Sequence, residues 1–162
     1  MRKASKWSWA AAAAALLAGC AITERPPPLT SATCDGSANA NREVVLAFYN
    51  EGLVGLQPRS AFERYMRPDF VEHKPDVPAG TREATITFLE LLIAELPQAR
   101  WEVVRTIAEG DMVFLHGRFT PEPGAPAYAI ADVFRLEGCR IAEHWDVVGP
   151  PPRQQRNPNS RF

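Results

Sequence analysis

One acidic side chain stands alone in an apolar segment and could act as a general base. Asp132 lies in the run Tyr128–Phe134, and its neighbours of the same parity on an extended strand are Ile130 and Phe134. If that face is the inner one, desolvation raises the pKa of Asp132, and the carboxylate can remove a proton α to a carbonyl near neutral pH. The alternative is an outer, solvated position.

The chain has only three histidines: His73, His116 and His144. His144 follows Asp132 across a turn centred near Gly138, so the two are expected opposite one another on paired strands, where directly paired residues share a face. We therefore predict that Asp132 and His144 form a catalytic pair. A structural ion pair on the outer face is the alternative, because a bulge can reset the parity of a strand.

The other chemistry that histidines could support is metal binding. His116 shares parity with Met112 and Phe114, which predicts that its imidazole faces an apolar interior. A three-histidine site would bring a metal-bound water, but the chain has no short-spaced pair such as His-x-His. We expect the histidines to be polar groups of a pocket, with no metal and no cofactor.

The spacing of apolar residues changes once along the chain, from the helical period to alternation. The segments of each kind must position the candidate residues. Apolar residues at helical spacing predict helices over 41–54, 58–66 and 81–96. Alternating residues predict strands over 100–108, 112–120, 127–136 and 140–148, after a short extended segment at 69–73. Helices followed by antiparallel strands are typical of an α+β domain.

Four apolar residues are candidates for the wall of a ligand pocket: Phe88, Leu92, Phe134 and Trp145. Phe88 and Leu92 lie on the apolar stripe of the third predicted helix. Trp145 shares parity with Ile141 and Val147, which favours a core position, with stacking on a planar ligand as the alternative.

The first twenty residues resemble the export signal of a bacterial lipoprotein. Basic residues at positions 2, 3 and 6 precede an apolar run that is too short to span a membrane, and the run ends in Leu-Ala-Gly-Cys at 17–20. We expect residues 1–19 to be a signal peptide and a lipidated Cys20 to anchor the protein to a bacterial membrane, in the cell envelope. A plain signal peptide is the alternative.

Proline-rich segments flank a single predicted domain over 41–150: a linker over 20–40 and a disordered tail over 151–162. Cys34 and Cys139 could form a disulfide in an oxidising compartment, or remain free thiols. The charge is nearly balanced, with 18 Lys+Arg and 19 Asp+Glu, and no basic patch stands out. A nucleic-acid partner is therefore not expected.

The closing hairpin carries the strongest motif. Asp-Val-Phe-Arg-Leu-Glu-Gly at 132–138 precedes Arg-Ile-Ala-Glu-His-Trp-Asp-Val at 140–147. This resembles the closing hairpin of the SnoaL-like polyketide cyclases, in the nuclear transport factor 2-like superfamily. Phe70–Pro75 is similar to the family's aromatic-x-x-His-x-Pro segment, and Gly110–His116 to its Gly-Asp strand that ends in His. Cys139 departs from the family, which usually has a lysine or a similar polar residue there.

The resemblance implies a cone-shaped barrel, made of a curled antiparallel sheet packed on three N-terminal helices. It also implies that Asp132 takes the place of the acid/base residue of characterised cyclases, which perform an intramolecular aldol condensation without a metal. His73 falls on a segment that often lines the mouth of the cone. Many relatives dimerise through the outer surface of the sheet, so a homodimer is one expectation.

Two functions of different classes fit these observations. The first is a cofactor-independent enzyme for aldol-type cyclisation, isomerisation or dehydration of a small apolar carbonyl compound, with Asp132 as base, His144 as its partner, and His116 and His73 in the cavity. The second is a non-catalytic lipoprotein that binds a hydrophobic ligand or a partner protein in the cell envelope, which the export signal favours slightly. Replacing Asp132 by Asn should abolish turnover in the first case and leave ligand affinity intact in the second.

Overall fold

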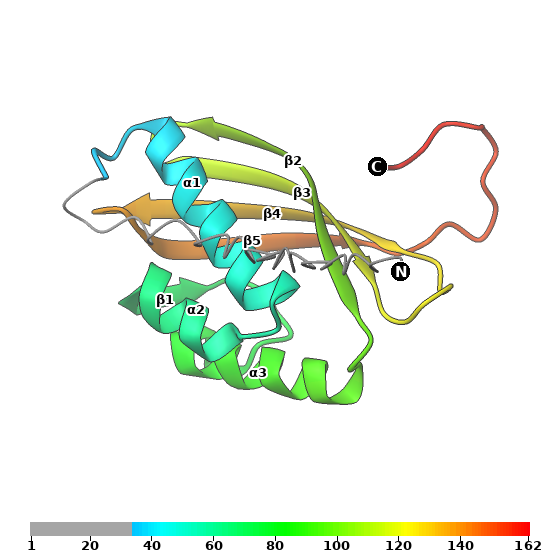
Figure 1. Cartoon of the computed structure of the whole chain (residues 1–162), viewed down its shortest axis with the longest axis horizontal. Coiled ribbons are helices and arrows are strands. Elements are labelled where there is room, and N and C mark those ends of the chain that lie inside the picture. The colour runs from blue at the N-terminus through cyan, green and yellow to red at the C-terminus, as the bar shows by residue number, and fades with distance from the viewer. Residues whose placement is uncertain (1–33) are drawn as a thin grey trace, which may run out of the picture.

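The computed structural model describes residues 34–162. Its three α-helices are α1 (Ala38–Tyr49), α2 (Pro58–Tyr65) and α3 (Arg82–Glu95). Its five strands are β1 (Met66–Glu72), β2 (Arg100–Glu109), β3 (Met112–Thr120), β4 (Tyr128–Glu137) and β5 (Arg140–Gly149). A π-helical turn, η1 (Asn50–Val54), continues α1, and a 3₁₀ turn, η2 (Pro78–Gly80), precedes α3. The helices lie on one side of a long curved sheet (Figure 1).

The sheet is mixed and open, in the order β1-β5-β4-β3-β2. Strands β2 to β5 form an antiparallel meander, as the sequence predicts, but β1 pairs with β5 in parallel. The expectation of a wholly antiparallel barrel is therefore corrected in this detail. No hairpin turn joins β1 to β5, and only a tight turn obliges neighbouring strands to run in opposite directions.

The helix α1 begins earlier than the sequence indicates. Its N-cap is Ser37, whose hydroxyl accepts a hydrogen bond from the backbone N–H of Ala40 at 3.2 Å. Asn41, where the sequence predicts the helix to begin, is buried inside it, and its amide donates to the carbonyl oxygens of Gly36 and Gly110 at 3.1 and 2.9 Å. Asn41 therefore ties the first turn of α1 to the β2–β3 turn.

The core lies between the helices and the inner face of the sheet. Phe48 of α1 is at its centre, with ring centroids 5.2 Å from Phe62 on α2 and 6.0 Å from Phe134 on β4, both edge to face. Aromatic pairs prefer this geometry, and each contributes about 0.5–1.5 kcal/mol beyond its buried area. The core thus fixes α1 and α2 against the middle of the sheet.

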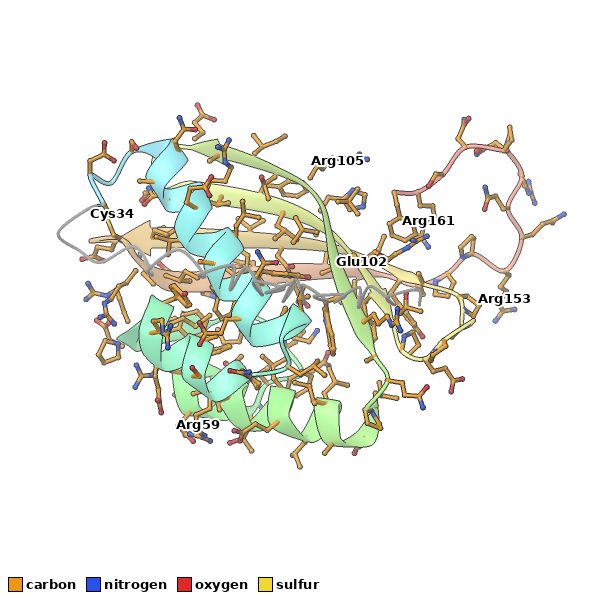
Figure 2. All side chains as sticks on the ribbon, viewed as in Figure 1. Cys34, Arg59, Glu102, Arg105, Arg153 and Arg161 are labelled. Atoms are coloured by element: carbon orange, nitrogen blue, oxygen red, sulfur yellow. A yellow bond between two sulfur atoms is a disulfide. The ribbon has the colours of Figure 1, made fainter. Side chains whose placement is uncertain are left out.

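Two features hold the ends of the described chain to opposite ends of the sheet, where Figure 2 shows Cys34 and Arg161. A disulfide joins Cys34 to Cys139 in the β4–β5 turn, with the Cα atoms 6.0 Å apart. The sequence predicts disorder over 151–162, but the structure gives this segment as an irregular loop that returns to the sheet. Arg161 donates to the carbonyl oxygens of Gly149 and Pro150 at 3.1 and 3.0 Å.

The predicted signal peptide (residues 1–19), Cys20 and most of the predicted linker lie outside the described residues. Among residues 34–162, none of the helices has the length and apolar character needed to cross a membrane.

Candidate functional site

A cavity of about 270 Å³ lies between the helices and the inner face of the sheet. Its wall is mostly aromatic and aliphatic, with Phe48 from α1, Trp101 from β2 and Phe119 from β3. The predicted pocket residues Phe88, Leu92 and Phe134 line it. Its volume is just below the about 300–1,000 Å³ of typical small-molecule sites, so it suits a small ligand.

The charged groups of the cavity gather on one wall. They come from β4, from β5 and from the end of β1 with the segment after it: Glu72, Lys74, Asp76, Asp132, His144 and Asp146. An apolar pocket with a few converging polar groups is the usual form of a small-molecule site.

His144 lies between two carboxylates. Its Nε2 is 3.2 Å from Oδ1 of Asp132, and its Nδ1 is 2.9 and 3.0 Å from the two carboxylate oxygens of Glu72. Asp132 is only 5% exposed, and Glu72 is buried as well. Since carboxylates only accept hydrogen bonds, both ring nitrogens must carry a proton to satisfy this arrangement, and the ring is then an imidazolium.

The pKa of each group follows from burial and from its partners. Burial alone lowers the pKa of His144, but hydrogen bonds from the ring to Asp132 and Glu72, and their negative charges, outweigh it and raise this pKa to about 10. Burial raises the pKa of Asp132 above its usual range, and the hydrogen bond and charge of His144 offset only part of that rise. Asp132 is therefore a stronger base than an exposed aspartate.

Asp132 and His144 meet through a register different from the predicted one. Asp132 pairs with Asp146, and His144 pairs with Phe134. A two-residue turn at Gly138 and Cys139 shifts the register by one residue, and a bulge between Ile141 and Glu143 shifts it by another. A shift of one residue would move the side chains of β5 to the other face, and a second shift returns them. Asp132 and His144 therefore still share the inner face, as diagonal neighbours.

Tyr49 adds a polar group that the sequence analysis did not single out. Its hydroxyl is buried at the cavity, close to the carboxylate of Asp132 but without a hydrogen bond of good geometry within residues 34–162. Burial raises its pKa, and the nearby charge of Asp132 raises it further. The hydroxyl is therefore a neutral donor beside Asp132. Its helical spacing indicated only a core residue, so the sequence held no signal for this role.

The prediction that His116 faces the cavity is wrong. His116 pairs with Arg105 and Ala131 on the outer face of the sheet, and its ring stacks on Phe162, with centroids 6.0 Å apart. The prediction assumed that the face of β3 with Met112 and Phe114 is the inner one. Both faces of β3 carry apolar residues, however, and Phe114 lies on the outer face while Leu115 is fully buried.

The prediction that His73 and Trp145 line the pocket is also wrong. The two rings stack on the outer face, 4.4 Å apart and nearly parallel. Nε2 of His73 lies 2.9 Å from the carboxylate of Glu143, which also accepts a hydrogen bond from Arg135 at 2.6 Å. His73 follows Glu72, which faces inward, so alternation places it on the other side.

Comparison with known proteins identifies the type of domain. Residues 43–144 match the model of a protein family described as a SnoaL-like domain. A search of curated proteins found no match. No group of three or more His, Cys, Asp or Glu side chains within residues 34–162 could hold a metal ion.

Solved structures share the fold. A candidate polyketide cyclase from Acidithiobacillus ferrooxidans is 20% identical over 67% of this chain and 87% of its own, with a TM-score of 0.58. A candidate SnoaL-like polyketide cyclase from Jannaschia sp. CCS1 is 26% identical, covering 68% of this chain and 86% of its own, with a TM-score of 0.54. AclR, a candidate hydroxylase from Streptomyces galilaeus, is 19% identical, covering 70% and 81%, with a TM-score of 0.59.

Proposed function

The chain belongs to the family of SnoaL-like domains, and on that premise we propose that it is an enzyme of acid–base chemistry. Its substrate is a small, apolar carbonyl compound, and its reaction is an aldol-type cyclisation, an isomerisation or a dehydration. The observation that carries the proposal is the contact between buried Asp132 and His144 on the polar wall of an apolar cavity.

Asp132 is the base in this proposal. Its carboxylate takes the proton from the carbon next to the carbonyl, the electrons of the broken C–H bond form a C=C bond, and the carbonyl π electrons move to oxygen as an enolate. Its raised pKa brings the carboxylate closer to the pH at which a general base works best.

His144 and Glu72 support the base. The imidazolium stabilises the ionised form of Asp132, and Glu72 fixes the ring through Nδ1. When Asp132 has taken a proton, the carboxylic acid returns it to the enolate carbon or to a leaving hydroxyl group. One carboxyl group thus serves as base and then as acid, which isomerisation and dehydration both require.

The solved structures that share this fold support the proposed substrate class, a small apolar carbonyl compound. Candidate polyketide cyclases are among the solved structures with this fold, and polyketide chemistry concerns compounds that carry carbonyl groups on apolar skeletons. The predominantly apolar wall of the cavity suits such a compound.

The test is α-proton exchange in 2-tetralone, a bicyclic ketone with acidic α-protons, followed by ¹H NMR in D₂O. We expect the wild-type protein to accelerate exchange and Asp132→Asn, which keeps the shape of the side chain, to slow it by about 10²–10⁴-fold. Binding of 2-naphthol, a fluorescent aromatic of the same shape, should persist in the variant.

The matched control is Asp111→Asn, which changes an exposed aspartate in the β2–β3 turn and should leave exchange unaltered. Binding of 2-naphthol without any acceleration of exchange by the wild-type protein would refute the enzymatic proposal, and would favour a ligand-binding module.

A further inference from the structure

Lysine is rare in this chain, and its position in the domain is informative. The three lysines are Lys3, Lys6 and Lys74, so Lys74 is the only one within residues 34–162. Its side chain is 17% exposed and lines the cavity, where His144 is the only other residue that can carry a positive charge. Arginine supplies all other basic side chains of residues 34–162.

The contacts of Lys74 place its ammonium beside the Asp132–His144 pair. Its Nζ lies 2.9 Å from Asp146 and 3.3 Å from Asp76, and its backbone N–H donates to Glu72 at 2.9 Å. Glu72 therefore orients both the imidazole ring of His144 and the backbone that carries Lys74.

We propose that Lys74 is a second catalytic residue, which binds the carbonyl oxygen of the substrate and stabilises the negative charge that develops there. This rests on the proposed function, in which Asp132 removes the α-proton. An ammonium has three N–H donors; one donates to Asp146, and Asp76 lies 3.3 Å away as an ion-pair partner, so at most two are engaged. The third is available for the substrate oxygen.

The spacing of the wall fits one carbonyl group and its α-carbon. Asp132 and Asp146 are direct partners on β4 and β5, and the Cβ atoms of such partners are about 4.5–5.5 Å apart. Because Lys74 is bound to Asp146, its ammonium and Asp132 lie on the same wall, on either side of the Asp146 side chain. Adjacent atoms of one small molecule can therefore contact Asp132 through carbon and Lys74 through oxygen.

The balance of charge selects a neutral ketone or aldehyde. On the polar wall, four carboxylates outnumber the cations of Lys74 and His144: those of Glu72, Asp76, Asp132 and Asp146. A substrate carboxylate would add another negative charge in an apolar cavity, where an uncompensated charge is costly. A neutral carbonyl becomes negative only as the reaction proceeds, which is when Lys74 stabilises it most.

The same contacts exclude Lys74 as a nucleophile. Burial alone lowers the pKa of Lys74, but the hydrogen bond and charge of Asp146 outweigh it, and the pKa lies above its usual value. The amine is therefore protonated at neutral pH, and a protonated amine does not attack a carbonyl carbon. Borohydride should not link 2-tetralone to Lys74.

The first experiment measures how an enolate-like oxygen ionises in the cavity. The probe is 2-naphthol, the aromatic analogue of the enol of 2-tetralone, whose absorbance changes on ionisation. We expect the pKa of bound 2-naphthol to be lower in the wild-type protein than in Lys74→Met by about one to three units, as for an opposite charge at close range. Lys74→Arg, which keeps the charge, should recover part of the difference.

The second experiment measures α-proton exchange of 2-tetralone in the same proteins. Lys74→Met should slow exchange by about 10²–10³-fold, as when one oxyanion donor is removed. The double variant Lys74→Met/Asp146→Leu also removes the ammonium, but it does not leave the carboxylate of Asp146 without its cation. Circular dichroism confirms that each variant is folded. Arg42→Met removes an exposed cation of α1 and should change neither measurement.

The outcomes separate the two proposals. Exchange that is lost in Asp132→Asn but unchanged in Lys74→Met, with an unchanged pKa of 2-naphthol, overturns the role of Lys74 and leaves the proposed function standing. A pKa of 2-naphthol that depends on Lys74, without exchange in the wild-type protein, supports the oxygen site and overturns the proposed function. Absence of 2-naphthol binding by the wild-type protein overturns both.

Discussion

At the scale of single residues, His144 is the group on which the site depends. It is buried between Asp132 and Glu72, and its two ring nitrogens contact both carboxylates. Taking charges out of water is costly, and removing one partner of a buried ion pair leaves an uncompensated charge. The three side chains should therefore respond to pH and to mutation as one unit.

We predict that the free energy of unfolding falls as the pH rises from about 6.5 to about 10. His144 has a raised pKa in the folded state, so its stabilisation is complete below the pKa of the unfolded chain and is lost as the pH passes the folded value. The raised pKa of Asp132 has the same sign, but its loss of stability begins at lower pH, above the usual pKa of an aspartate. Urea unfolding across this range measures the loss.

The variant Glu72→Gln tests this pH dependence of the free energy of unfolding. It removes a charge and one of the two acceptor oxygens that hold the pKa of His144 high, so the loss of stability should still begin near the unfolded pKa but end at lower pH and be smaller in total. His116→Gln changes a histidine on the outer face and should retain the wild-type profile. Identical profiles for Glu72→Gln and the wild-type protein would contradict the prediction.

The sequence allowed part of this site to be predicted. Asp132 and His144 lie on a hairpin, where local strand parity brings them to one face. Glu72 and Lys74 belong to the site because β1 pairs with β5 in parallel, and no local pattern encodes a pairing between segments about 70 residues apart. The same pairing of β1 with β5 places His73 on the outer face of the sheet, away from the cavity.

At the scale of elements, α3 supplies part of the apolar wall of the cavity. Phe88, Leu89 and Leu92 face the cavity, and Leu91 points to solvent with 60% of its surface exposed. The helix begins at Thr81, whose hydroxyl accepts a hydrogen bond from the N–H of Ala84 at 3.3 Å. This cap satisfies a backbone N–H of the first turn and fixes where α3 begins.

We predict that Leu92→Trp fills the cavity and abolishes binding of 2-naphthol. The larger indole occupies space that the ligand needs, and it contacts the aromatic wall instead. Fluorescence titration measures the loss. Leu91→Trp, one residue away on the exposed side, should bind as the wild-type protein does, and equal binding by both variants would show that the probe sits elsewhere.

Most helices and strands could be predicted from the sequence to within a few residues, because each carries a clear apolar period. The start of α1 could not, since Asn41 resembles a cap but donates its amide to a carbonyl oxygen 69 residues away. The register of β4 and β5 could not either, because the bulge at Ala142 has no distinctive residue. Such details depend on partners that are remote in sequence.

At the scale of the whole molecule, one covalent link joins the segment before α1 to the last hairpin. The disulfide connects Cys34 and Cys139 across 105 residues and spans nearly all of the domain. A link of this span restricts the unfolded chain strongly, because many open conformations become inaccessible.

We predict that reducing this disulfide lowers the free energy of unfolding by about 2–5 kcal/mol. Urea unfolding with and without a reductant measures the difference. The double variant Cys34→Ser/Cys139→Ser should match the reduced wild-type protein and should not respond to the reductant. If the reductant leaves the wild-type midpoint unchanged, the link does not stabilise the fold.

The parallel pairing of β1 with β5 also sets when the proposed base can meet its partners. Glu72 and His144 are separated by 72 positions, and β5 is the last strand of the sheet. During synthesis, a chain that ends before β5 has Asp132 but neither its imidazole nor a neighbour for β1. Such a chain cannot hold a charged base in an apolar cavity. The proposed site is therefore complete only after β5 has been synthesised and has paired with β4 and β1.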